Sequence, residues 1–175
     1  MNRNRLLQIL ILVAALIVGI YAITTTFSKE EQPVKVGSMA QEFKLLGLDG
    51  QIHNLSDYHG KVLVINFWGT FCPPCVREMP ALQKQYDLWK DRSVEIVGIN
   101  LNESKISVES FVKQLNIGFP ILLDNDTVRK KYKVMSYPTT FFIDPQGIIQ
   151  DIFVGEMTEN NIKTRIEKIV RTSQK

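Results

Sequence analysis

The pattern of apolar and polar positions in residues 37–175 predicts strands and helices in turn. Residues 43–46 and 51–55 flank Asp49-Gly50, a pair typical of a tight hairpin turn. Residues 61–68 are almost continuously apolar, as expected of a strand covered on both faces. The same reasoning predicts helices at 72–90, 107–115, 126–132 and 158–171, and strands at 94–100, 121–123, 139–143 and 148–154.

The order of these elements, β-β-β-α-β-α-β-α-β-β-α, predicts one α/β domain. We expect a mixed central sheet with helices on both faces and an N-terminal β-hairpin extension. In such sheets, ligand sites lie at the carboxyl ends of the strands. Residues 71–75 directly follow the apolar strand, so we expect them at such an end.

A second apolar segment precedes this domain. Residues 6–23 carry no charge and, as a helix, would reach about 27 Å, enough to span the hydrocarbon of a bilayer. Arg3 and Arg5 precede the segment and no acidic residue appears before Glu30, so the positive-inside rule keeps the N-terminus in the cytoplasm. The alternative is a cleaved secretory signal, although residues 21–27 offer only a weak cleavage site.

We therefore expect a single-pass protein of the cell membrane. The expected parts are a cytoplasmic N-terminus with one transmembrane anchor at 1–28, a tether at 29–36 and an extracytoplasmic domain at 37–175.

The charges are nearly balanced. The chain has 21 basic and 18 acidic side chains, a net charge of +3. Arg3 and Arg5 are two of the basic residues and the first 28 residues hold no acid, which leaves 19 basic against 18 acidic side chains. This balance argues against a nucleic-acid surface. We expect a monomeric domain without a nucleic-acid partner.

Cys72 and Cys75, the only cysteines, open the helix that follows the apolar strand. Residues three apart in the first turn of a helix face the same way, with Cα atoms about 5 to 6 Å apart, as a disulfide requires. The free N–H groups and positive dipole end of the helix stabilise a thiolate there. Because Pro73 favours an extended conformation at Cys72, we expect Cys72 to be the more exposed sulfur and the nucleophile, and Cys75 to be the resolving thiol.

Other uses of two cysteines fit the sequence less well. A structural disulfide closing so short a loop would restrain the unfolded chain little. A zinc site needs four ligands, and His53 and His59 lack the spacing to complete one. A c-type haem site needs histidine after the second cysteine, where Val76 stands. We expect a redox-active disulfide with no metal and no other cofactor.

Two segments together resemble the thioredoxin fold. Trp-Gly-Thr-Phe-Cys-Pro-Pro-Cys occupies 68–75, and Tyr-Pro-Thr-Thr-Phe-Phe-Ile-Asp occupies 137–144. With residues 43–46 and 55–61 added, the chain is similar to the membrane-anchored thiol-disulfide oxidoreductases of the ResA/TlpA type. The resemblance covers the whole outward domain and the anchor. It implies reduction of extracytoplasmic protein disulfides, with apocytochrome c as substrate in cytochrome c maturation and a CcdA-like transmembrane thiol transporter as reductant.

The resemblance also implies roles for single residues. Pro138 matches the cis-proline beside the active disulfide, where a cis bond after Tyr137 exposes the Tyr137 backbone to an extended substrate. Glu78 matches the acid that ResA-like proteins carry three residues after the second cysteine. We expect it to hinder ionisation of the thiol, or to exchange protons with it through a water. The alternative is a solvated glutamate on the helix surface.

Further residues near the predicted site have weaker assignments. Glu103 falls at the same edge and could bind substrate or be a loop acid in water. Trp68 and Phe71 are expected to line the disulfide, although either could belong to the core. ResA-like sequences commonly place an acid between the cysteines, whereas this chain has Pro73 and Pro74, so redox potential and partner choice are not carried over.

Three other functions stay open. A peroxiredoxin-like peroxidase has a similar N-terminal region, but such sites generally use T-x-x-C, and here Gly69 stands three residues before Cys72 and Thr70 only two. A general extracytoplasmic disulfide oxidase would use the same cysteines to oxidise substrate thiols, and an isomerase would use them to rearrange substrate disulfides. The non-enzymatic alternative is a holdase or docking module with a structural disulfide.

Overall fold

The computed structural model describes residues 3–27 and 34–173, which fall into two units, 1–32 and 33–175. The first unit holds α1 (Arg3–Phe27), in which the described side chains, at 8–21, are exposed. Among the described residues, no helix is both long and apolar enough to cross a bilayer. The anchor at 1–28 stays a prediction, and the tether predicted at 29–36 lies outside the described residues up to residue 33.

The second unit is built on a seven-stranded mixed sheet. Its strands, in the spatial order β2-β1-β5-β4-β3-β6-β7, are β1 (Lys44–Gly47), β2 (Ile52–Asn54), β3 (Val62–Trp68), β4 (Val94–Leu101), β5 (Ile121–Asp124), β6 (Thr139–Ile143) and β7 (Ile149–Val154). The three central strands β3, β4 and β5 are parallel, and the other pairings are antiparallel. The predicted mixed sheet and its N-terminal hairpin, β1-β2, are confirmed.

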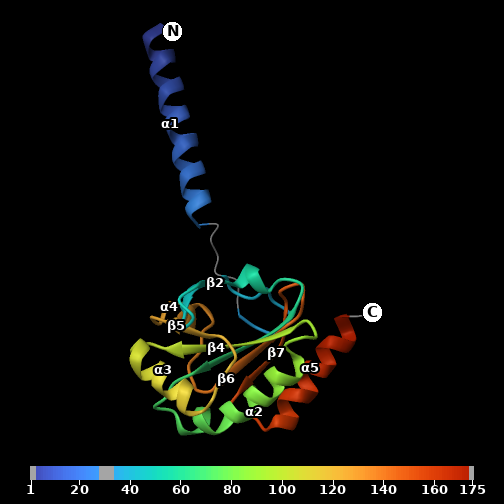
Figure 1. The fold of residues 1–175 in the computed structure, drawn as a ribbon. Coiled ribbons are helices and arrows are strands. Elements are labelled where there is room, and N and C mark those ends of the chain that lie inside the picture. The colour runs from blue at the N-terminus through green and yellow to red at the C-terminus, as the bar shows by residue number, and fades with distance from the viewer. Residues whose placement is uncertain (1–2, 28–33, 174–175) are drawn as a thin grey trace. The chain divides into compact units, whose positions relative to one another are not determined.

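Helices cover both faces of the sheet. They are the 3-10 helix η1 (Leu55–Tyr58), α2 (Pro73–Trp89), α3 (Lys105–Gln114), α4 (Thr127–Lys131) and α5 (Glu159–Ser173). Side chains of α2, α3 and α5 share one apolar cluster, whereas η1 and α4 contribute to the cluster on the other face. Figure 1 shows α2 and α5 side by side against the sheet. Thr158 caps α5 as predicted, since its Oγ1 accepts the N–H of Asn161 at 3.3 Å.

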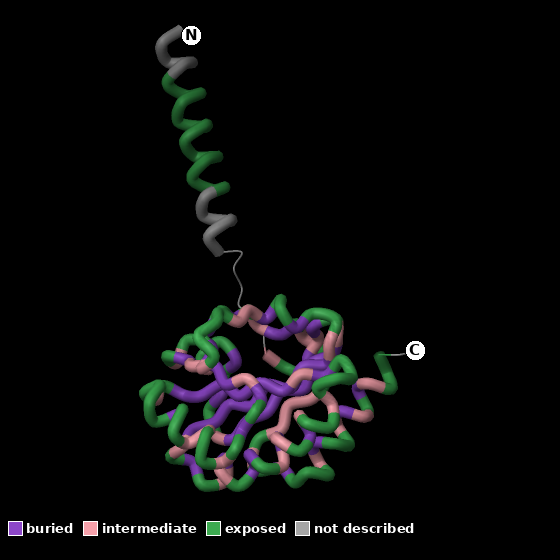
Figure 2. The backbone as a smooth tube through the Cα atoms, viewed as in Figure 1, coloured by how far each residue is buried: buried purple, intermediate pink, exposed green. Residues whose placement is uncertain are grey.

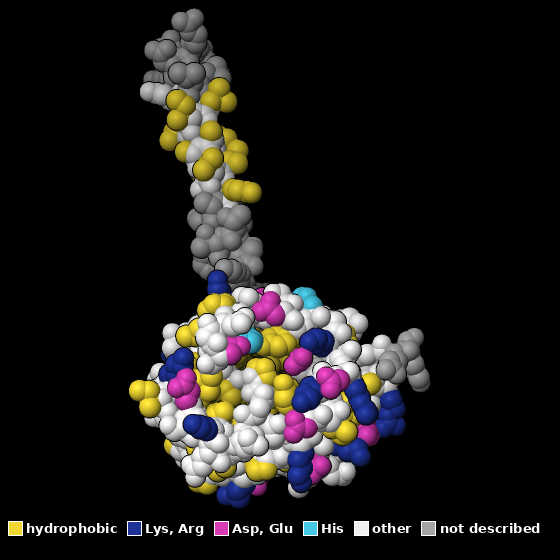
Figure 3. Space-filling model, in the orientation of Figure 1, with side chains coloured by type: hydrophobic (Ala, Val, Ile, Leu, Met, Phe, Trp, Pro, Cys, Tyr) yellow, Lys and Arg dark blue, Asp and Glu magenta, His cyan; other side chains and the backbone are white. Residues whose placement is uncertain are grey.

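The core follows the central strands, which Figure 2 shows as the buried part of the domain. All seven residues of β3 are buried, as its apolar run predicts. Asn66 is the one polar residue among them. The surface is of mixed charge, with basic and acidic side chains interspersed over the face shown in Figure 3.

Strand pairing brings three loops to one edge of the sheet. Trp68 at the end of β3 pairs with Asn100 near the end of β4, and Phe67 pairs with Thr139 at the start of β6. Residues 69–75, 102–104 and 136–138 therefore meet at this edge. It is the edge at which the sequence placed the cysteines.

Candidate active site

Cys72 and Cys75 form a disulfide at the N-terminus of α2, with their Cα atoms 5.3 Å apart. Cys72 is the N-cap residue, in an extended conformation, and is 7% exposed, whereas Cys75 is 1% exposed. Pro73 and Pro74 have no N–H, so the first N–H of the helix belongs to Cys75, and it donates to Cys72 Sγ at 3.3 Å. This donor and the positive end of the helix would stabilise a thiolate on Cys72.

Glu78 lies one turn further along α2 and is 1% exposed, so the alternative of a solvated surface glutamate is wrong. Its carboxyl group has two long contacts: Asn66 Nδ2 donates to Oε1 at 3.5 Å and the Met157 N–H donates to Oε2 at 3.4 Å. Burial raises the pKa of Glu78 to about 8; the Met157 N–H opposes this shift and the charge of Glu156 adds to it. Near neutral pH this carboxyl therefore holds a proton in most molecules.

The Tyr137–Pro138 peptide bond is cis, as the resemblance implied. Pro138 is buried and Tyr137 is half-buried. The ring of Phe71, which is 60% exposed, meets the Tyr137 ring edge-on with centroids 6.3 Å apart. The two rings form an apolar surface that joins the cysteine loop to the cis-proline loop.

Glu103 is bonded to the loop that leads into Cys72. Its carboxylate accepts the Thr70 N–H at 2.8 Å, the Thr70 hydroxyl group, and Asn100 Nδ2 at 2.8 Å. The carboxylate is half-buried, unlike a loop acid in water. This geometry gives Glu103 a clear part in positioning the loop, and its part in substrate binding stays a prediction.

Trp68 is fully buried and packs in the same apolar cluster as both cysteines. Its indole lies over Gly98 of β4, where an added Cβ would come within 2.9 Å of Trp68 Nε1. The close approach explains why residue 98 is a glycine. Trp68 therefore supports the disulfide from within the core, while Phe71 faces solvent.

The turn at 155–158, between β7 and α5, closes one side of the site. Gly155, at a φ of +112° that favours glycine, donates its N–H to the carbonyl of Pro138 at 2.8 Å. Met157 is 2% exposed and packs with the cysteines, and burying such a side chain contributes about 1.5–3 kcal/mol. Outside, the carboxylate of Glu156 binds the guanidinium of Arg77. The turn thus connects α2, the cis-proline and Glu78.

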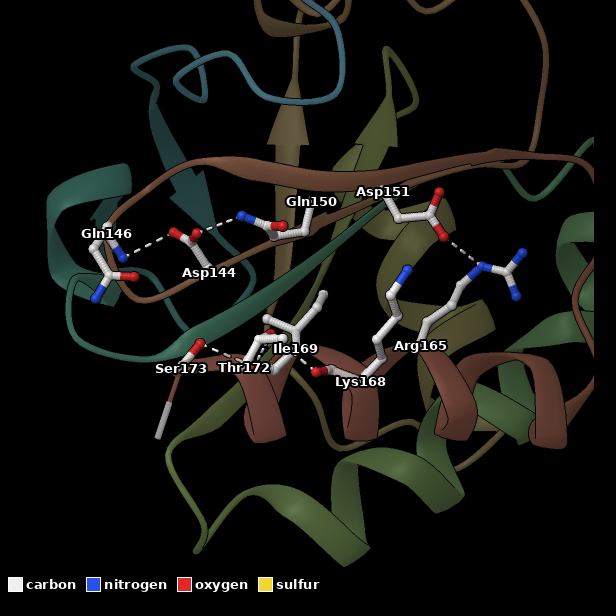
Figure 4. A pocket seen from close by; sticks show the side chains of 9 residues that line it. All are labelled: Asp144, Gln146, Gln150, Asp151, Arg165, Lys168, Ile169, Thr172 and Ser173. Carbon is white, nitrogen blue, oxygen red and sulfur yellow. Dashed lines mark hydrogen bonds and ion pairs between the residues drawn. The ribbon is translucent and has the colours of Figure 1, made fainter. Parts of the chain in front are cut away.

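A hollow between α5 and residues 144–151 belongs to the opposite edge of the sheet, near the start of β3 (Figure 4). Asp144 accepts from the Gln146 N–H at 2.9 Å and from Gln150 Nε2 at 2.6 Å, and Arg165 pairs with Asp151 at 2.8 Å. None of the residues that line this hollow belongs to the disulfide site.

The sequence pointed to most of these side chains but missed several of their partners. Asn66 could have been found, because it is a polar residue inside an apolar strand; it also donates to Thr140 Oγ1 at 2.9 Å. Met157 and the pair of Arg77 with Glu156 gave no signal in the sequence, since the turn is 79 residues from α2.

Comparisons with known proteins agree with this geometry. A family model described as the AhpC/TSA family matches residues 36–152. The chain is 44% identical over 162 residues to the thiol-disulfide oxidoreductase ResA of Geobacillus kaustophilus, covering 92% of this chain and 91% of that protein. It is 41% identical over 155 residues to ResA of Bacillus subtilis, covering 88% and 85% of the two chains.

Solved structures show the same fold. StoA from Bacillus subtilis is 29% identical with a TM-score of 0.65, covering 76% of this chain and 98% of that one. A DsbF homologue from Corynebacterium diphtheriae is 28% identical with a TM-score of 0.69, covering 75% and 87%. With its thioredoxin-like fold and its disulfide at the start of α2, the chain belongs to the AhpC/TSA family and, within it, to the ResA-type thiol-disulfide oxidoreductases.

Proposed function

We propose that this oxidoreductase reduces disulfides of proteins outside the cytoplasm. The observation that carries the exchange chemistry is the asymmetry of the two sulfurs: Cys72 is the N-cap of α2 with 7% exposure, and Cys75 lies behind it with 1% exposure. Cys72 is therefore the sulfur that a substrate would reach first. Cys75 is placed to attack the mixed disulfide that results. The reducing direction is taken from the resemblance to the ResA-type proteins.

The reaction runs in two exchanges. The Cys72 thiolate attacks one sulfur of the substrate disulfide, and the other substrate sulfur leaves as a thiolate and takes a proton. Cys75 then loses its proton and attacks Cys72 Sγ, which breaks the mixed disulfide and releases the second substrate thiolate. Two electrons pass to the substrate, and the enzyme ends with the Cys72–Cys75 disulfide.

Glu78 is the proposed proton partner of Cys75. Its pKa is raised to about 8 and it lies one turn from Cys75 on α2, so near neutral pH it can both hold and release a proton next to that thiol. An ionised Glu78 would also oppose a second negative charge on the thiol, which would slow reaction with indiscriminate partners.

We assign substrate binding to the loop that contains the cis-proline, Pro138. The backbone of Tyr137 would pair with an extended segment of the substrate, and the exposed ring of Phe71 would contact apolar side chains next to the attacked disulfide. Trp68 would support the disulfide from within the core. Glu103 would hold the loop before Cys72 in place and could also contact the substrate.

The proposed setting is the outer face of the cell membrane. The predicted anchor at 1–28 would hold the domain there, apocytochrome c would be the substrate in cytochrome c maturation, and a CcdA-like transmembrane thiol transporter would return electrons. The resemblance and the ResA relatives support this proposal.

A trapping experiment tests the substrate. In a Cys75→Ser chain expressed in the native membrane, the mixed disulfide on Cys72 cannot be resolved and its partner can be identified by mass spectrometry. We expect apocytochrome c in the trap, and none with Cys72→Ser. A trap that holds only unrelated secreted proteins would favour a general disulfide oxidase or isomerase.

Two other outcomes separate the remaining alternatives. Consumption of hydrogen peroxide by the purified protein would indicate a peroxidase. The match to the AhpC/TSA family is compatible with this alternative. Undiminished function of a Cys72→Ala chain in cells would indicate a holdase or docking module.

A further inference from the structure

A surface ion pair lies beside the buried Glu78. Arg77 precedes Glu78 on α2, and Glu156 precedes Met157, whose N–H donates to Glu78. Arg77 Nε lies 3.0 Å and Nη2 2.5 Å from Glu156 Oε2. The side chains are 60% and 37% exposed, so both charges can be reached by salt and by a partner protein.

The ion pair is not what holds the turn in place. Met157 is buried in the apolar cluster around the cysteines, and the Gly155 N–H is bonded to the Pro138 carbonyl. A buried side chain and a backbone hydrogen bond hold a turn more firmly than an exposed ion pair, which adds little to stability. Removing one charge of the pair should therefore leave the turn where it is.

The ion pair of Arg77 with Glu156 instead affects the electrostatic surroundings of Glu78. Burial keeps Glu78 protonated, the Met157 N–H favours its ionised form, and the negative charge of Glu156 disfavours that form. Arg77 lies against Glu156 and offsets its charge.

The other polar groups around Glu78 that the structure describes come from β3, from the redox centre and from α5. Asn66 of β3 contacts the carboxyl and is itself bonded to Thr140 of β6, and Cys75 lies one turn earlier on α2. From α5, Glu159 is occupied by Lys84 and Gln85 of α2. Glu156 is the charged group that raises the pKa of Glu78, and Arg77 acts on Glu78 through its ion pair with Glu156.

We propose that Arg77 and Glu156 set, through their opposite charges, how readily Glu78 releases its proton. The pair acts through Glu78, so both members are positioning residues. Its consequence for catalysis rests on the proposed function of Glu78 as proton partner of Cys75. A substrate or partner that binds to either charge would then change the proton exchange at the disulfide.

Two single substitutions that break the same ion pair should shift the pKa of Glu78 in opposite directions. In Arg77→Gln the charge of Glu156 is no longer offset, and the pKa of Glu78 rises. In Glu156→Gln that charge is gone and Arg77 is free to favour the carboxylate, so the pKa falls. We expect each shift to be roughly half a unit, about threefold in the proton dissociation constant, and to shrink with added salt. In the double variant the pKa of Glu78 should lie between its values in the two single variants.

The titration is followed by ¹³C NMR of the Glu78 carboxyl in the full-length oxidised chain, with Glu78→Gln to assign the signal. Lys84→Gln and Glu159→Gln are matched controls, because they remove the same kinds of charge from a separate ion pair, which joins α2 to α5 at 3.2 Å. A merely structural role would open the turn to water and lower the pKa in both test variants. Shifts of the same sign, or shifts no larger than in the controls, would overturn the inference.

A kinetic readout keeps the inference separate from the proposed function. The pH dependence of mixed-disulfide resolution should follow the pKa of Glu78 in each variant. Opposite shifts of Glu78 with an unchanged pH dependence would support the charge pair and contradict the role of Glu78 as proton partner.

Discussion

Replacing Glu78 with glutamine should change how the stability of the oxidised protein depends on pH. Glu78 has a pKa of about 8 in the folded protein, against an ordinary value of 4.5. Between these values the folded chain holds a proton that the unfolded chain has lost. The stabilising contribution of protonated Glu78 is therefore complete below pH 4.5 and is lost as the pH rises through 8.

The magnitude follows from the two pKa values. One pKa unit corresponds to about 1.4 kcal/mol, so the full loss is about 5 kcal/mol. Between pH 5 and pH 7 the loss amounts to about 2.5 kcal/mol. These figures are upper bounds, because a folded chain that admits water to the ionised carboxylate loses less. The glutamine side chain of the variant cannot ionise, and so Glu78→Gln lacks this dependence.

Urea unfolding at pH 5, 6, 7 and 8 measures the effect on the oxidised chains, in which the cysteines do not titrate. The quantity of interest is the stability of wild type minus that of Glu78→Gln, since other titrating groups cancel. The difference should fall by up to about 2.5 kcal/mol from pH 5 to pH 7. Glu109→Gln, which removes an exposed acid of α3, is the control for the loss of one carboxyl group. A difference for Glu78→Gln that does not change between pH 5 and pH 7 would refute the reasoning.

Two more predictions concern the groups around the disulfide. Glu103→Ala removes the acceptor of the Thr70 N–H and of Asn100 Nδ2, so we expect a loss of about 1–3 kcal/mol in urea unfolding and several-fold slower disulfide exchange in stopped-flow. An exchange rate equal to that of wild type would show that the loop does not need this carboxylate. Gly98→Ala places a Cβ 2.9 Å from Trp68 Nε1 and 2.7 Å from a methyl group of Ile121, which should cost about 1–3 kcal/mol. Unchanged thermal stability would mean that the indole moves aside freely.

Much of the fold could be predicted because local patterns of apolar and polar residues indicate the strands and helices. The apolar run of β3 predicts a strand buried on both faces, and all its residues are buried. Two predicted bounds differ from the structure: α3 begins at Lys105 rather than at 107, and residue 55 opens the helix η1 instead of ending a strand. A single apolar residue followed by polar ones fits either element, and only the contacts of Leu55 and Tyr58 with the core favour the helix.

The site was predictable where its chemistry is local. Cys72 and Cys75 lie three apart, and the two prolines define the helix start, so their geometry follows from the chain itself. Glu78 shows the limit of this reasoning: its position on α2 was clear, but its burial depends on Met157, which is 79 residues away. For Glu103 the structure adds the bond to Thr70, 33 residues away.

The sequence by itself determined the reaction class and the edge of the sheet at which it takes place. The tertiary structure decided the proton affinity of Glu78, because desolvation depends on which residues pack over a carboxyl group and not on its neighbours in the chain. It also brought Arg77 and Glu156 together beside that carboxyl. Local spacing therefore defines the redox pair, and the packing of α2 against the turn at 155–158 defines the electrostatic surroundings in which it works.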